Sequence, residues 1–206
     1  LWHMRAMQSD IKAPWQSTVV RYLLRPRPWF SMQLKDIVDS RLVKVKGPVN
    51  YNRTLFLVRP RKIPAPYVSV HVRFGNKAAE QKLKPLDSYM KMVKHKYPHV
   101  RNIFISTETD EVIHSLVRNY ERYTFYFIDY PRQEKLPLRN RVHVFNYADE
   151  FMFSMANLYV AVRAQGFVGT LTSNWCSLVM EMERTRGDGG SDYMSLDHGS
   201  SMSVCF

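Results

Sequence analysis

The sequence predicts an α/β fold in which a parallel sheet carries helices on both faces and is preceded by a helical, basic segment. From residue 67 onward, short apolar runs alternate with runs of helical period, the pattern of βαβ units. Before that point the chain is rich in Lys and Arg, and three prolines lie between residues 60 and 66. Such spacing is typical of a stiff, exposed linker. We therefore expect a basic segment over residues 1–64 and an α/β domain over residues 65–206.

The composition is that of a globular chain. Hydrophobic residues make up 45% and aromatic residues 13% of the 206 residues, enough for a buried core. No apolar run approaches the ~20 residues that span a bilayer, and residues 1–10 lack the apolar core of a signal peptide. A chain that starts on Leu1 is expected to be a fragment. Cys176 and Cys205 are expected to be free thiols, because two cysteines form no disulfide framework or metal site.

The net charge of +12 is unevenly distributed. Residues 1–64 hold 13 Lys/Arg against 3 Asp/Glu, whereas residues 65–206 hold 17 against 15. A basic arm on a nearly neutral domain is typical of contact with a polyanion or a membrane surface. It also fits a fragment that has lost an acidic partner. The charge alone leaves both interpretations open.

The elements of the basic segment are expected to be helical and irregular up to residue 46. The apolar-periodic run Ser17–Leu24 ends before Pro26 and Pro28, which cannot continue a helix. A second helix is expected from Trp29 to Val43, with apolar residues on or near one face at Phe30, Leu34, Ile37 and Leu42.

Strands and helices then alternate along the α/β domain. The first strand is expected over Tyr67–Arg73. The elements expected after it are a helix over Pro85–Lys94, a strand over Asn102–Ser106, a helix over Asp110–Glu121, a strand over Thr124–Asp129, a polar loop over Pro131–Arg141, a short strand over Val142–Phe145, a helix over Glu150–Ala164 capped by Asp149, a strand over Gly166–Gly169 and a helix over Asn174–Arg184. The glycine- and serine-rich tail from about residue 187 is expected to be loosely ordered.

The first strand ends in a group of polar side chains. His71 and Arg73 alternate along it and so face the same side, and Asn76, Lys77 and Glu80 follow in the next loop. Ligands of open α/β sheets bind beyond the carboxyl ends of the strands, so we expect a site there. Glu80, beside the cationic Lys77, could serve as a general base. A core histidine at His71 and a solvated carboxylate at Glu80 remain open alternatives.

A second candidate site is the turn Thr170–Asn174, which leads into a helix. The free N–H groups of a helix N-terminus and the hydroxyls of Thr172 and Ser173 suit an anion. With Arg73 opposite, a diphosphate would be held from both sides. An ordinary helix cap without a ligand fits the same residues, and that interpretation stays open.

Several nucleotide- and metal-binding motifs are absent from the sequence. It contains no G-x-G-x-x-G, no G-x-x-x-x-G-K-[ST], no His/Cys/carboxylate cluster with metal spacing and no D-x-D triplet. The sequence therefore disfavours a nicotinamide dehydrogenase, a P-loop NTPase and a zinc enzyme. It also disfavours a glycosyltransferase that holds its nucleotide through a divalent ion.

Five segments, in order and at similar spacing from about residue 15 to residue 197, resemble one family. They are Trp15–Trp29, Val70–Lys77 (similar to H-V-R-R-T-D-K), Ile105–Glu108 (similar to A-T-D-D), Phe167–Cys176 (similar to L-V-C-T-F-S-S-Q-V-C) and Tyr193–Asp197 (similar to a later S-L-D). The family is that of the eukaryotic α1,6-fucosyltransferases and the bacterial nodulation fucosyltransferases.

The resemblance implies a GT-B-like architecture whose C-terminal, Rossmann-type lobe binds the donor. Residues 65–206 would be that lobe, and residues 1–64 a remnant of the N-terminal lobe. The implied reaction transfers fucose from GDP-fucose to the innermost GlcNAc of an N-glycan or chitin-type core, with inversion and without a metal or cofactor. The implied partners are the nucleotide-sugar donor and a glycan or glycoprotein acceptor, without nucleic acid. The implied location is the Golgi lumen, in a parent protein with a type II membrane anchor.

The resemblance also implies roles for individual residues. Glu80 would be the base for the acceptor hydroxyl, and Arg73 and Lys77 would complete the catalytic set. The residues implied in donor binding are His71, Arg73, Asn76, Thr107, Glu108, Asn157, Thr170, Thr172, Ser173 and Asn174.

The chain departs from the family pattern at some of these positions. Phe74 stands where the family has its second arginine, Asn76 and Asn157 stand where it has aspartates, and Glu108-Thr109 replaces paired aspartates. Two alternatives therefore accompany the transferase hypothesis: an inactive nucleotide- or glycan-binding homologue, and a polyanion-binding module that uses residues 1–64.

Overall fold

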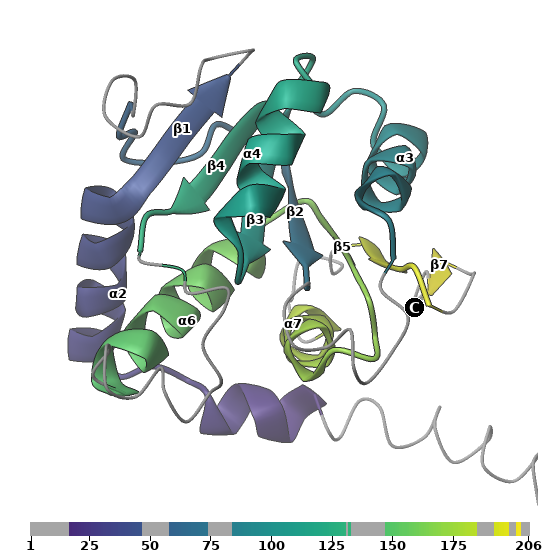
Figure 1. Ribbon diagram of the computed structural model, residues 1–206. Coiled ribbons are helices and arrows are strands. Elements are labelled where there is room, and N and C mark those ends of the chain that lie inside the picture. The colour runs from purple at the N-terminus through teal and green to yellow at the C-terminus, as the bar shows by residue number, and fades with distance from the viewer. Residues whose placement is uncertain are drawn as a thin grey trace, which may run out of the picture.

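The computed structural model describes residues 17–46, 58–73, 84–130, 132, 147–184, 192–197 and 201–202. Within these ranges the chain forms one mixed sheet with helices on both sides (Figure 1). Besides a helical stretch at residues 17–23, the elements are α2 (Pro28–Arg41), β1 (Leu42–Lys46), β2 (Tyr67–Val72), α3 (Leu86–Lys96), β3 (Asn102–Thr107), α4 (Asp110–Asn119), β4 (Thr124–Ile128), α6 (Tyr147–Ala161), β5 (Gly166–Gly169), α7 (Asn174–Arg184), β6 (Asp192–Ser195) and β7 (Ser201–Met202).

The sheet has the strand order β1-β4-β3-β2-β5-β6-β7. The five strands from β4 to β6 are parallel to one another, whereas β1 and β7 are antiparallel to their neighbours at the two edges. Parallel pairing requires a crossover between strands, and helices supply it here. The predicted α/β class and the parallel sheet are confirmed.

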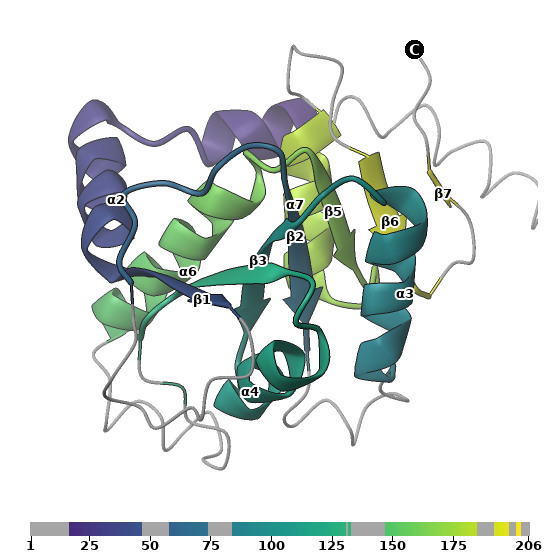
Figure 2. The same ribbon diagram turned by 90° about the horizontal axis from the view of Figure 1, so that it is seen from above.

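Alternation along the central strands separates two apolar layers. Val68, Val70 and Val72 of β2 pack with α3 and α4, in a cluster that also holds Ile103 and Ile105 of β3. On the other face, Phe104 and Tyr126 pack with α2 and α6, and Phe167 packs with α7. Figure 2 shows these two groups of helices on opposite sides of the sheet. Both faces of the central strands are thus buried, as their continuous apolar runs predict.

Strand β1 differs from the sequence prediction, which placed Leu42 and Val43 at the end of a helix. The helix ends at Arg41, and the next five residues pair with β4, with Leu42 opposite Ile128. Val43 and Val45 enter the core on the α3–α4 side. Residues 42–46 are therefore part of the sheet, and α2 packs against α6 on one of its faces. Alternating β-branched residues explain the strand, because they suit a pleated surface.

The C-terminal tail also differs from the prediction. Residues 192–195 form β6, which pairs in parallel with β5, and Tyr193, Met194 and Ser195 are buried. Met194 joins one core layer and Tyr193 the other, so this part of the tail is ordered despite its serine- and glycine-rich surroundings. The helix expected from Glu150 begins at Tyr147 instead, so Asp149 lies in its first turn rather than at its cap.

Candidate functional site

Strands β2 and β5 form the topological switch point of the sheet. They are paired in parallel, with Val68 opposite Gly166 and Val70 opposite Val168. The helix that follows β2 packs on one face of the sheet, and the helix that follows β5 packs on the other. The connections therefore diverge beyond the carboxyl ends of these two strands. Open α/β sheets bind ligands in the crevice that this divergence leaves.

His71, near the end of β2, lies on the α6–α7 side of the sheet. Its Nδ1 is 3.0 Å from the hydroxyl of Ser106 on β3, and its ring centroid is 6.1 Å from that of Trp175 on α7. The side chain is buried, and its Nε2 has no hydrogen-bond partner among the described residues. A buried ring nitrogen without a partner is costly unless a ligand or water satisfies it.

The pKa of His71 is lowered to about 3, mainly by burial and further by the positive charge of Arg73, while a hydrogen bond with Ser106 opposes the shift. His71 is therefore neutral at physiological pH. In that state one ring nitrogen donates and the other accepts a hydrogen bond. This histidine can bind a polar group, but it cannot provide a positive charge for a phosphate.

Arg73 follows β2 directly and supplies that positive charge. Its Nη1 is 3.4 Å from Oε1 of Glu108, which follows β3, and both side chains are about 30% exposed or less. The Nε of Arg73 is buried and has no hydrogen-bond partner among the described residues. The guanidinium group thus keeps a free donor beside one carboxylate, and an incoming diphosphate would compete with Glu108 for it.

The carboxyl end of β3 is fixed by a buried arginine. The backbone carbonyl of Thr107 accepts hydrogen bonds from the hydroxyl of Tyr130 and from Nε of Arg132, both at 3.2 Å. Arg132 also pairs with Asp110 at 3.1 Å and donates to the carbonyl of Ile128 at 2.6 Å. The predicted donor-binding residue Thr107 is itself buried, and its hydroxyl accepts from the N–H of Thr109. Its contacts here are structural.

The turn from Thr170 to Asn174 is held by a carboxylate of the chain itself. The N–H and hydroxyl of Thr172 donate to Oδ2 of Asp197, at 3.0 and 2.7 Å. The hydroxyl of Ser195 accepts from the N–H of Leu171, at 3.3 Å. An external anion could reach the two donors of Thr172 only by displacing Asp197. The predicted anion-suited turn is thus present, with an internal anion on it.

The rest of this turn is closely packed. Thr170 and Ser173 are buried, whereas Asn174, the first residue of α7, is exposed. The N–H of Ser173 donates to the carbonyl of Thr170, at 3.0 Å. A Cβ on Gly169 would lie 2.7 Å from the sulfur of Cys176, so only glycine allows this approach of β5 to α7. Burial raises the pKa of the Cys176 thiol to about 11, so the predicted free thiol is present but inert.

Asn157 lies within α6 and is buried. Its side-chain amide donates to the carbonyl of Phe153, at 2.8 Å, and its Oδ1 has no hydrogen-bond partner among the described residues. That oxygen can accept a hydrogen bond from the N–H group of a ligand, the role in donor binding that the resemblance implies for Asn157. Because Oδ1 is covered, a base would reach it only after the atoms above it move.

The predicted site is therefore brought together only in part. His71, Arg73 and Glu108 gather at the ends of neighbouring strands, and Trp175 links His71 to the first turn of α7. The other predicted residues of the loop after β2 lie outside the described residues: Phe74, Asn76, Lys77 and Glu80, together with the expected strand Val142–Phe145 and Cys205.

Asp197 is the residue that the sequence analysis missed. It was noted in an S-L-D match but was given no contact, because its partner Thr172 is 25 residues away. In the described part of the chain there is no group of three or more His, Cys, Asp or Glu residues placed to hold a metal ion. Among the described helices, none is both long and apolar enough to cross a membrane.

The fold is that of an α/β protein in which His71, Arg73 and Glu108 gather at the switch point of a parallel sheet. No protein-family model and no curated protein matches the chain. Similar solved structures include POFUT1 in complex with GDP-fucose in crystal form I, with a TM-score of 0.47, 12% identity, and coverage of 82% of this chain and 46% of that one.

Crystal form II of the same complex gives a TM-score of 0.45 at 12% identity and the same coverage. A high-resolution structure of POFUT1 with GDP gives a TM-score of 0.43 at 12% identity, covering 82% of this chain and 47% of that one. The chain thus spans about half the length of the POFUT1 chains that it matches.

Proposed function

We propose that the chain binds a guanosine diphosphate sugar at the carboxyl ends of β2 and β5, as the donor-binding part of a fucosyltransferase. The observation that carries this proposal is a pair of buried nitrogen atoms, Nε2 of His71 and Nε of Arg73, without partners among the described residues. Both lie at the strand end where open α/β sheets bind ligands. Their segment, Val70–Lys77, is one of the five that resemble α1,6-fucosyltransferases.

In the proposed reaction, Glu80 removes the proton of an acceptor hydroxyl. The acceptor oxygen attacks the anomeric carbon of fucose from the side opposite GDP, and the bond from that carbon to the phosphate oxygen breaks. The configuration at that carbon inverts. Arg73 stabilises the negative charge that develops on the departing diphosphate, a term that often dominates catalysis of this kind. No metal ion takes part in this proposed scheme, and Lys77 adds a second positive charge.

The acceptor in this proposal is a glycan hydroxyl of the N-glycan core type. A parent protein anchored in the Golgi membrane, with its catalytic part in the lumen, belongs to the same proposal. Both rest on the five sequence segments rather than on a contact in the structure.

Calorimetric titration with GDP in EDTA tests donor binding. We expect GDP to bind the unaltered chain, and Arg73→Ala to lose at least about tenfold in affinity, because a charge-assisted contact to phosphate contributes 1.5 kcal/mol or more in general. Arg61→Ala removes the same charge from an exposed site after β1 and serves as the matched control. Absence of heat with GDP at millimolar concentration, in a folded chain, would contradict the proposal.

A second candidate function is a homologue that binds the nucleotide without turnover. Phe74 and Asn76, where the family has charged residues, favour it. Release of GDP from GDP-fucose in the presence of a chitin-type acceptor separates the two candidates. Turnover that is lost in Glu80→Gln while GDP still binds supports the enzyme, whereas binding without any turnover supports the inactive homologue.

A further inference from the structure

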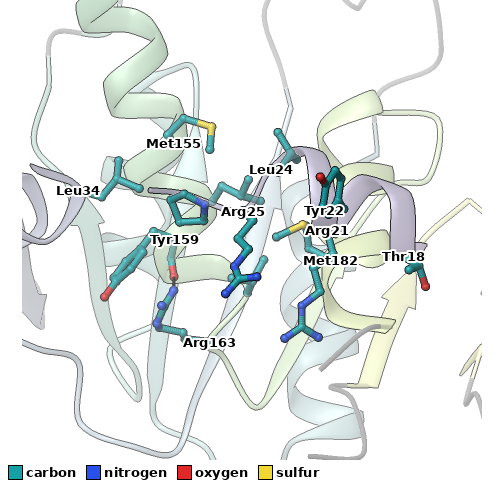
Figure 3. A pocket seen from close by; sticks show the side chains of 13 residues that line it. Thr18, Arg21, Tyr22, Leu24, Arg25, Leu34, Met155, Tyr159, Arg163 and Met182 are labelled. Atoms are coloured by element: carbon teal, nitrogen blue, oxygen red, sulfur yellow. Dashed lines mark hydrogen bonds between the residues drawn. The ribbon is translucent and has the colours of Figure 1, made fainter. Parts of the chain in front are cut away.

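A groove of about 770 Å³ lies on the face of the sheet that α2, α6 and α7 cover (Figure 3). We call it the helix-side groove; residues 17–26 form one wall, and α2, α6 and α7 complete it. Its apolar lining consists mainly of Leu24, Leu34, Met155, Leu158, Val162 and Met182. None of the residues proposed to bind the nucleotide lines it.

Three arginines line the same groove, and no aspartate or glutamate is among the described residues that line it. Figure 3 shows the side chains of Arg21 and Arg25 extending in the same direction, with Arg163 beside Tyr159. Arg163 is held in place: its guanidinium carbon lies 3.4 Å from the ring centroid of Tyr159, and its Nη1 donates to the carbonyl of that residue.

Arg21 and Arg25 are not held in this way. Both side chains are exposed, and neither guanidinium group forms an ion pair or hydrogen bond with any described residue. Two guanidinium groups beside an apolar floor are therefore available to a ligand with complementary charge. Arginine suits such a role because its planar group binds a carboxylate through two parallel hydrogen bonds.

The segment that forms one wall of the groove, together with α2, exposes several large apolar side chains. Four of the six large hydrophobic side chains that the described chain exposes lie in residues 17–46: Tyr22, Leu23, Trp29 and Met32. Tyr22 is 77% exposed and also lines the groove. An apolar groove flanked by exposed apolar side chains and unpaired charges is a common feature of interaction sites.

We propose that the helix-side groove binds an acidic, amphipathic polypeptide segment. Its apolar side chains would fill the floor, in the manner of a helix laid into a groove, and its carboxylates would pair with Arg21 and Arg25. A nucleic acid fits less well, because sugars and phosphates buried against the apolar floor would lose their hydrogen bonds to water without replacement there. The basic charge of residues 1–64 then serves a protein partner rather than a nucleic acid.

The test measures fluorescence anisotropy of a labelled helical peptide of about 15 residues, with Leu at i, i+3, i+4 and i+7 positions and Glu elsewhere. We expect saturable binding to the full chain, weakened about tenfold or more in the double variant Arg21→Glu/Arg25→Glu. Arg61→Glu/Lys62→Glu reverses two exposed charges outside the groove and should bind as the unaltered chain does. GDP binding should not differ among the three proteins.

Three results would overturn the proposal. One is equal peptide affinity in both double variants; another is equal binding of a control peptide that carries Lys in place of Glu. The third is displacement of the peptide by a duplex oligonucleotide that binds more tightly. That result would show that the groove binds nucleic acid. Circular dichroism of both variants shows whether each is folded.

Discussion

The imidazole of His71 and the guanidinium of Arg73 share one environment but have different roles. Burial and the neighbouring positive charge keep His71 neutral, so it contributes hydrogen bonds. Arg73 remains partly exposed and contributes the charge, which Glu108 offsets in part. The division explains how two basic residues can lie close together at one strand end without both being charged.

The lowered pKa of His71 predicts a specific dependence of stability on pH. In the unfolded chain the group titrates near its ordinary value of 6.5, whereas in the folded chain it titrates near 3. Between these values the unfolded state binds the extra proton, so the free energy of unfolding falls as the pH falls. The expected loss from this residue is about 2 kcal/mol between pH 6.5 and pH 5.

Urea unfolding of the unaltered chain and of His71→Asn, at both pH values, measures this contribution. The variant should lose less stability than the unaltered chain over the same interval, whatever its stability at pH 7. Equal losses in the two proteins would show that His71 titrates normally.

The ion pair between Arg73 and Glu108 leads to a second prediction at this scale. In Glu108→Gln the competing carboxylate is gone, so the affinity for GDP should rise by about threefold to tenfold. Calorimetric titration with GDP measures the expected gain in affinity in this variant and the expected loss in Arg73→Ala. A fall in GDP affinity in Glu108→Gln would mean that the carboxylate itself contacts the nucleotide.

Among the elements, the turn between β5 and α7 and its neighbour β6 form one unit. Asp197, just beyond β6, accepts two hydrogen bonds from Thr172, and the N–H of Leu196 donates to the carbonyl of Gly169. The turn therefore depends on a strand more than 20 residues later in the chain. The carboxylate of Asp197 lies near the N-terminus of α7, where a negative charge is favoured.

Asp197→Ala separates the structural contribution of this carboxylate from its effect on a ligand. Losing two hydrogen bonds should lower the free energy of unfolding by about 1–2 kcal/mol. Removing a negative charge beside the proposed diphosphate site should raise GDP affinity at the same time. Urea unfolding and calorimetry measure the two effects, and a loss of GDP binding in a folded variant would contradict the placement of the diphosphate.

The contact between β5 and α3 leaves no space for a side chain at Gly166. A Cβ there would lie 2.2 Å from the hydroxyl oxygen and 2.3 Å from Cζ of Tyr97, which is itself buried. Gly166→Ala should therefore lower the free energy of unfolding by about 1–3 kcal/mol. In a Tyr97→Ala background the same change should cost much less, and additive costs in the double-mutant cycle would contradict this account.

Across the whole molecule, residues 28–46 support the sheet rather than precede it. α2 packs against α6 over Phe104 and Tyr126, and β1 covers the edge of β4. Arg59 adds a link from the following connector, since it pairs with Asp129 and donates to the carbonyl of Ser40. Residues 28–46 and Arg59 of the positively charged segment are thus integrated with the fold.

Two truncations test this integration. Removing residues 1–46 exposes the edge of β4 and an apolar layer, so we expect the melting temperature to fall by more than about 10 °C, or cooperative unfolding to be lost. Removing residues 1–27 keeps α2 and β1 and should cost less. If the chain without residues 1–46 melts at the same temperature as the unaltered chain, α2 and β1 are dispensable for stability.

The sequence alone predicted the central strands of the sheet but missed strands toward its edges. Continuous apolar runs made β2, β3, β4 and β5 recognisable, because strands buried on both faces need them. β1 was missed because Leu42 lies four residues after Val38 and continues the helical spacing without a Gly or Pro between them. β6 was missed because its four residues lie in a polar tail, and Tyr193 and Met194 become buried only through the pairing of this strand with β5.

The candidate site was predictable only where it depends on one strand. The alternation of His71 and Arg73 could be read from the sequence, whereas their partners depend on register. Glu108 meets Arg73 because β2 and β3 align Val72 with Thr107, and Asp197 meets Thr172 because β6 lies beside β5. Contacts of this kind are set by the assembled sheet.

The central claim is that a guanosine diphosphate binds where β2 and β5 end. The most direct test is an amide chemical-shift titration of the isotope-labelled chain with GDP. We predict saturable shifts at residues 71–73, 107–109 and 170–175, with residues 17–46 unaffected. Shifts confined to residues 17–46, or no shifts at all with millimolar GDP, would contradict it.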